Sequence, residues 1–143
     1  MKTFKLGGTH PNDNKLSAES QIQTSALPTE AIIPLSQHIG APAKPIVAKG
    51  DKVKVGQLIA EASSFMSANI HSSVSGTVSK IDDIIDASGY KRPAIYITVE
   101  GDEWEENIIR KKELLSNCTL SAEEIIAKIK DMGIVGMGGV LII

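Results

Sequence analysis

The chain has 143 residues, of which 42% are hydrophobic, 22% charged and 3% aromatic, a composition typical of one soluble globular domain. Fifteen Lys and Arg residues against seventeen Asp and Glu residues give a net charge of −2, so no basic surplus indicates a nucleic-acid or anionic-membrane partner. The single cysteine, Cys118, excludes an intrachain disulfide and any zinc or iron–sulfur site built from cysteine alone.

Residues 1–30 are predicted to form an extended N-terminal arm. Turn-forming residues crowd its first half, and a Ser/Gln/Thr-rich stretch then runs to Leu27-Pro28 without hydrophobic periodicity. The start of the chain lacks the apolar core of a secretory signal peptide, and no run of about 20 mostly apolar residues predicts a membrane span. The single cysteine favours a location on the reducing, cytoplasmic side.

Short β-type runs cut by glycine follow the arm, which indicates a small sandwich or barrel. Pro34 limits its run to a sheet edge or a strand end, because proline has no N–H for the ladder. Gly56 and Gly76 are predicted to occupy turns with positive φ, so that valine at either position costs on the order of 1–3 kcal/mol. The expected strands are residues 31–35, 45–48, 58–62, 77–81 and 94–99.

The C-terminal third has a different pattern. Ser121 followed three residues later by Glu124 is a capping box, and it predicts a helix that begins there and ends at Gly133 in the left-handed conformation. Trp104 and Ile108, four residues apart, favour a second helix over residues 103–115.

The segments 50–61 and 74–81 resemble the biotinyl and lipoyl carrier family, whose barrel-sandwich hybrid fold consists of two similar halves. Such carriers bear a modified lysine on the hairpin between the halves. In this chain that position falls at or near Phe65, and no lysine lies between Lys54 and Lys80. The resemblance therefore implies the carrier fold without the attachment chemistry.

A closer resemblance covers nearly the whole chain and is strongest over residues 34–42, Pro-Leu-Ser-Gln-His-Ile-Gly-Ala-Pro. Together with residues 4–11, 50–62 and 71–78, this stretch is similar to the opening part of the RnfC protein, the C subunit of the Rnf electron-transport complex. The family implies a membrane-peripheral protein on the NADH side of a complex that passes electrons between NADH and ferredoxin and couples this to ion transport. Other subunits of that complex are the implied partners, with NADH and ferredoxin at the level of the complex, on the cytoplasmic face.

The family order is a barrel-sandwich hybrid, a flavin- and NADH-binding domain and a ferredoxin-like domain, so FMN and 4Fe-4S clusters are expected in the full-length parent and no cofactor in this chain. Gly136, Gly138 and Gly139 resemble the first loop of the flavin domain, after which the rest of the pocket is missing. A flexible connector is the alternative for this loop. No catalytic residue and no metal ligand is predicted.

Two further sets of residues are candidates for a functional role. His10, His38 and His71 are the only histidines, and structural roles are favoured over zinc ligation for them. Phe65 and Met66, flanked by serines on the predicted hairpin tip, either form a partner-binding surface or fold back onto the barrel or the arm.

The predicted architecture is a mainly β chain with the arm at residues 1–30 and a barrel-sandwich hybrid at 31–100. A helical linker and the truncated start of an α/β flavin domain follow at 101–143. The predicted function is a non-catalytic N-terminal scaffold module of an RnfC-type protein. The alternatives are a biotinyl or lipoyl carrier, an unmodified carrier-like binding module, and a flavoenzyme fragment that still binds FMN.

Overall fold

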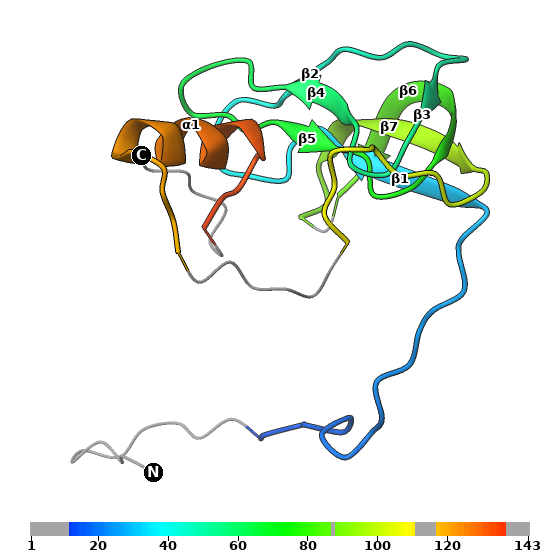
Figure 1. Ribbon diagram of the computed structural model, residues 1–143. Coiled ribbons are helices and arrows are strands. Elements are labelled where there is room, and N and C mark those ends of the chain that lie inside the picture. The colour runs from blue at the N-terminus through cyan, green and yellow to red at the C-terminus, as the bar shows by residue number, and fades with distance from the viewer. Residues whose placement is uncertain (1–11, 87, 111–116, 137–143) are drawn as a thin grey trace, which may run out of the picture.

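A computed structural model describes residues 12–86, 88–110 and 117–136, which form two antiparallel sheets and a short helix (Figure 1). One sheet has the strand order β1-β7-β6-β3 and the other the order β2-β4-β5. The strands are β1 (Glu30–Pro34), β2 (Lys44–Pro45), β3 (Lys52–Val53), β4 (Leu58–Glu61), β5 (Ile70–His71), β6 (Gly76–Ile85) and β7 (Lys91–Val99), and the helix is α1 (Ala122–Asp131). The mainly β fold with a C-terminal helix is confirmed.

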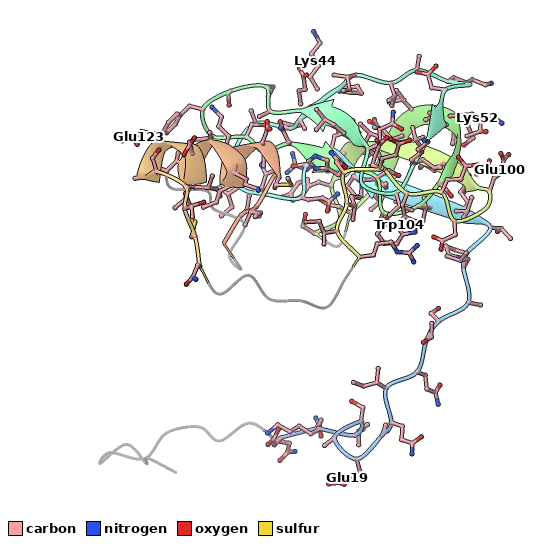
Figure 2. The ribbon with its side chains drawn as sticks, viewed as in Figure 1. Glu19, Lys44, Lys52, Glu100, Trp104 and Glu123 are labelled. Carbon is pink, nitrogen blue, oxygen red and sulfur yellow. The ribbon has the colours of Figure 1, made fainter. Side chains whose placement is uncertain are left out.

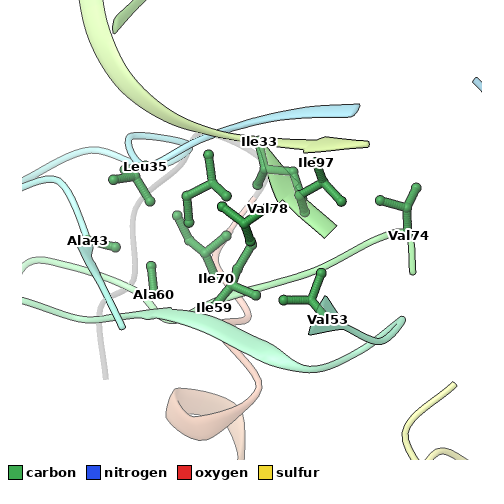
Figure 3. Close-up of a cluster of buried hydrophobic side chains, with 11 residues drawn as sticks. Ile33, Leu35, Ala43, Val53, Ile59, Ala60, Ile70, Val74, Val78 and Ile97 are labelled. Atoms are coloured by element: carbon green, nitrogen blue, oxygen red, sulfur yellow. The ribbon is translucent and has the colours of Figure 1, made fainter. Parts of the chain in front are cut away.

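The core lies between the two sheets (Figure 3). Ile95 and Ile97 of β7 are fully buried, and Ile59 of β4 meets them from the other sheet. Alternate residues of a strand point to one face, so β7 supplies this layer through Ile95 and Ile97. The remaining members are Ile33, Leu35, Ala43, Val53, Ala60, Ile70, Val74 and Val78.

The outer face of β7 breaks this alternation at Tyr96, which is only 8% exposed. The Lys80 ammonium lies 4.2 Å from the centre of its ring, and the Tyr96 hydroxyl donates to the Asp83 carbonyl (3.2 Å). Lys80 also donates to Asp82 Oδ2 (3.1 Å), which raises the pKa of Lys80 and lowers that of Asp82. The Tyr96 ring thus contacts a cation, and its hydroxyl has a hydrogen-bond partner.

The C-terminal helix α1 forms as its sequence predicts. Ser121 Oγ accepts a hydrogen bond from the Glu124 N–H (3.2 Å), and Glu124 Oε2 accepts one from the Ser121 N–H (2.8 Å). Gly133, with φ 64°, follows the last turn. The predicted edge position of β1, which ends at Pro34, is also confirmed.

The helix predicted over residues 103–115 is wrong for residues 103–110, and its remainder, 111–116, lies outside the described residues. Trp104 instead forms a parallel bridge with Val55, which donates to the Glu103 carbonyl (2.8 Å) and accepts from the Glu105 N–H (3.0 Å). Pairing with the barrel therefore overrides the weak helical pattern. The second predicted strand is shorter than expected, since β2 spans only Lys44–Pro45, although the Ile46 N–H still donates to the Ile59 carbonyl of β4 (3.0 Å). The domain boundaries at residues 30 and 100 stay a prediction.

Candidate functional site

The loop between β4 and β5, residues 62–69, carries the predicted tip at its outer end. Phe65 is 80% exposed and Met66 39% exposed, whereas Ser67 and Ala68 directly after them are buried. Phe65 therefore stands on the turn between two strands, where the carrier resemblance places the lysine of a biotinyl or lipoyl domain. The loop contains no amine to which such a cofactor can be joined.

Two hydrogen bonds within the loop close its base. The Asn69 side-chain oxygen accepts from the Ala62 N–H (2.9 Å), and Ser67 Oγ accepts from the Ser63 N–H (3.2 Å). These bonds join the outgoing and the returning halves of the loop. Burying the Ser67 hydroxyl is tolerated because the hydroxyl has this partner.

A second loop, residues 36–42, holds the first from the side. The Ala41 N–H donates to the Met66 carbonyl (2.9 Å), and Ser63 Oγ donates to the Pro42 carbonyl (2.6 Å). At Gly40, with φ 117°, a Cβ would lie 2.0 Å from the Met66 carbonyl oxygen, so only glycine fits there. The apolar tip is thus presented on a frame of fixed backbone.

His38 and His71 are the two histidines that lie within the described residues. His38 Nε2 accepts a hydrogen bond from the Ala68 N–H (3.1 Å), so this imidazole ties the two loops together. His71 is half-buried in β5, and His10 lies outside the described residues. In the part of the chain that the structure describes, no group of three His, Cys, Asp or Glu side chains is placed to hold a metal ion.

Helix α1 is attached close to the same loop. Asn69 Nδ2 donates to the Asp131 carbonyl (3.1 Å), and Gly133 passes so near Asn69 that a Cβ would lie 2.1 Å from the Asn69 carbonyl oxygen. Between α1 and the barrel lies an open cavity of about 550 Å³. Its walls include Leu58, His71, Ile108, Lys128 and Met132.

The glycine loop predicted from the flavin domain can be placed only in part. Gly136 is exposed at the end of the described chain, and Gly138 and Gly139 lie outside the described residues. Cys118 is exposed, with its thiol free. Among the described residues, no helix is long and apolar enough to cross a membrane.

Local sequence patterns predict the Phe65–Met66 tip but not the frame residues, whose hydrogen bonds and close contacts hold the loop that carries the tip. The frame residues are His38, Gly40, Ser63 and Asn69. The partners His38 and Ala68 are 30 residues apart, and Asn69 and Asp131 are 62 apart, so no local pattern reports them. The family resemblance of the stretch 34–42 is the one signal in the sequence that points towards this loop.

Comparison with known proteins identifies the family to which this fold and loop belong. A sequence profile of the RnfC barrel sandwich hybrid domain matches residues 2–102. The chain belongs to this family. The predicted resemblance to RnfC is therefore confirmed, and with it the barrel-sandwich hybrid fold.

Curated relatives show the same resemblance over almost the whole chain. The C subunit of the proton-translocating ferredoxin:NAD(+) oxidoreductase complex of Clostridium ljungdahlii is 45% identical over 97% of this chain and 30% of its own length. The C subunit of the ion-translocating oxidoreductase complex of Rhodobacter capsulatus is 43% identical over 97% of this chain and 27% of its own length. The C subunit of the Na(+)-translocating ferredoxin:NAD(+) oxidoreductase complex of Acetobacterium woodii is 39% identical over 96% of this chain and 30% of its own length. The chain thus spans less than a third of the length of these relatives.

The absence of a lysine on the tip leads to a prediction about the purified chain. We expect an intact mass equal to that of the unmodified polypeptide and no visible absorbance, because a flavin or other coloured group brings its own absorption. Mass spectrometry and a visible spectrum after gel filtration measure both. A mass increment of biotin or lipoate, or a yellow band that stays with the protein, would contradict the prediction.

Proposed function

We propose that this chain is the N-terminal docking module of the RnfC protein in an ion-translocating ferredoxin:NAD(+) oxidoreductase complex. The observation that carries the proposal is the match of 97% of the chain to the C subunits of such complexes, at 45% and 43% identity. In this role the module binds other subunits at the cytoplasmic face of the membrane and takes no part in electron transfer itself. NAD(H) and ferredoxin are substrates of the whole complex.

The Phe65–Met66 tip supports the docking role. A side chain that is 80% exposed contributes little to the module's own core, while the loop that carries it is bonded to the second loop through the Ala41 N–H, the Pro42 carbonyl and the His38 imidazole. Aromatic and methionine side chains are enriched where proteins meet. An ordered apolar tip among serines is therefore suited to enter a pocket on a neighbouring subunit or domain.

The remainder of the parent protein would supply the redox chemistry. FMN is expected in a domain that begins near Gly136–Gly139, and 4Fe-4S clusters in a cysteine-rich domain, since each cluster takes four thiolates and this chain has only Cys118. The names of the relatives specify ferredoxin and NAD(+) but neither of these cofactors. Both assignments stay predictions.

The proposal is tested by co-purification. Expressed with an affinity tag in a bacterium that makes the complex, the 143-residue chain is expected to retain other subunits of the complex on the resin. The affinity tag alone serves as the control for non-specific retention. Recovery of the folded chain alone, from cells in which the complex is abundant, would contradict the docking role.

A further inference from the structure

The side chain of His38 joins loop 36–42 to loop 62–69 by accepting a hydrogen bond from a buried backbone group. His38 Nε2 lies 3.1 Å from the nitrogen of Ala68, which is only 4% exposed. Among the described residues, the Ala68 N–H has no other hydrogen-bond partner. A buried N–H that loses its acceptor keeps the full cost of its desolvation. The attachment of loop 62–69 therefore depends on the state of one imidazole.

The geometry of this bond requires a neutral ring. A backbone N–H can only donate, so Nε2 must offer its lone pair, and the single proton of the ring is then on Nδ1. Nδ1 lies on the side of the Ile39 carbonyl oxygen, at 3.4 Å. If Nε2 takes up a proton from solvent, a second donor faces the Ala68 N–H, and the hydrogen bond between His38 and Ala68 is lost.

The other titratable group beside His38 is a second histidine. His38 and His71 of β5 line the same cavity of about 210 Å³, and no carboxylate lines it among the described residues. Neither loop 36–42 nor loop 62–69 contains a titratable residue besides His38. On its other side, His71 lines the larger cavity, whose wall includes Asp131. Like charges on two imidazoles at one cavity repel each other, so His71 adds to the cost of charging His38.

The neighbouring charged residues provide no ion pair for the ring. Lys44, which follows loop 36–42, points away from the barrel in Figure 2, and Glu61 at the end of β4 and Lys130 near the end of α1 are exposed. Residues 133–135, which reach the same cavity, carry no charge. Within the described chain, no ion pair involves an imidazole. A positive charge on His38 is therefore not compensated there.

We propose that His38 makes the attachment of loop 62–69 to loop 36–42 dependent on pH. The neutral ring holds the Ala68 N–H and keeps the returning half of loop 62–69 against loop 36–42, and proton uptake releases it. Histidine ordinarily changes its charge between about pH 5 and 8, so the attachment is complete at the upper end of this interval and lost towards the lower end.

The release is local, because the other bonds between the two loops do not titrate. The Ala41 N–H still donates to the Met66 carbonyl, and Ser63 Oγ still donates to the Pro42 carbonyl. The barrel stays folded while the segment around Ala68 loosens. Because this loop carries the Phe65–Met66 tip, the consequence for docking rests on the proposed function, whereas the release itself does not.

Hydrogen exchange of the Ala68 amide in the 143-residue chain tests the proposal. After correction for the intrinsic effect of pH on exchange, we expect this amide to exchange at least about fivefold faster at about pH 5 than at about pH 8. The amide of Ile97, in the strand that pairs with both β1 and β6, is the internal control and should show no such change.

Three variants assign the effect to one ring. His38→Gln keeps an oxygen that can accept from the Ala68 N–H but does not titrate, so Ala68 should stay protected at both pH values. His38→Leu removes the acceptor, and Ala68 should exchange fast at both. His71→Gln should keep the pH dependence with a smaller amplitude.

Two results would overturn the inference: equal protection of Ala68 at the two pH values in the unchanged chain, or a pH dependence that persists in His38→Gln. Retention of other subunits of the complex, measured at the same two pH values, tests the consequence for docking. The unchanged protein should lose partners at the lower pH and His38→Gln should keep them. If no partner is retained at either pH, the proposed function fails, while the exchange of Ala68 still decides the inference.

Discussion

Replacing Gly76 with alanine is expected to lower the free energy of unfolding by about 3 kcal/mol. Gly76 begins β6 and lies between Val53 of β3 and Val99 of β7. A Cβ there would stand 2.0 Å from the Thr98 carbonyl oxygen and 3.1 Å from the Glu100 N. Both are backbone atoms, so the sheet itself would have to move.

Gly50→Ala is the matched control for backbone strain. Gly50 also has a positive φ, 96°, but a Cβ there would meet nothing within 4 Å, so only the strain of about 1 kcal/mol remains. Gly56→Ala should fall between the two, because its Cβ would meet the flexible end of the Ile108 side chain. Urea unfolding of the three variants gives the ranking. A Gly76→Ala midpoint equal to that of Gly50→Ala would mean that the β3–β6–β7 contact is looser than described.

Sequence alone predicted the features of the fold that local patterns encode. Glycine punctuation located β1, β4, β6 and β7, and the positive φ expected at Gly56 and Gly76 is confirmed at 84° and 154°. Gly76, however, lies in strand β6 and not in the predicted turn. The Ser121–Glu124 capping box predicted the start of α1 because both its hydrogen bonds join residues three apart.

The missed elements depend on partners distant in sequence. β3 and β5 are two residues long, too short for any periodic pattern, and they exist because β6 and β4 pair with them. β6 runs on to Ile85 through the polar pair Asp82 and Asp83, where pairing with β7 replaces intrinsic preference. For the same reason, Val55 holds Trp104 in an extended conformation where the spacing of apolar residues indicates a helix.

For the candidate site too, local patterns predicted one part and missed the part that depends on residues distant in sequence. The sequence placed Phe65 and Met66 on a turn but left open whether they are exposed or fold back onto the barrel or the arm, and the structure exposes both. Their position on a turn was therefore predictable. Their fixed placement was not, because it depends on residues 38–42 and on Asn69, whose partners are the Ala62 N–H and the distant Asp131 carbonyl. The sequence therefore shows which side chains the loop carries, and the tertiary hydrogen bonds show that the loop is joined to residues 38–42 and to α1.

The double variant Phe65→Ser/Met66→Ser is expected to fold as the parent does and to lose its partner. The side chains that change are exposed, while the loop's hydrogen bonds involve the Met66 carbonyl and the side chains of Ser63, Ser67 and Asn69, which the variant keeps. The free energy of unfolding should thus stay within about 0.5 kcal/mol of the parent value. Association with the other subunits should weaken by about 2 kcal/mol, or about 30-fold, as expected when an aromatic anchor is removed from an interface.

Ile85→Ser/Tyr90→Ser is the matched control, because these side chains at the β6–β7 hairpin are 67% and 66% exposed. It removes comparable apolar surface from a different part of the barrel and should leave association unchanged. Thermal unfolding and quantitative pull-down separate the effects on stability and on binding. A large fall in melting temperature for the tip variant, with association intact, would assign Phe65 and Met66 to the module's own core. Equal losses of association for both variants would mean that exposed apolar area in general, rather than the tip held by residues 38–42, drives docking.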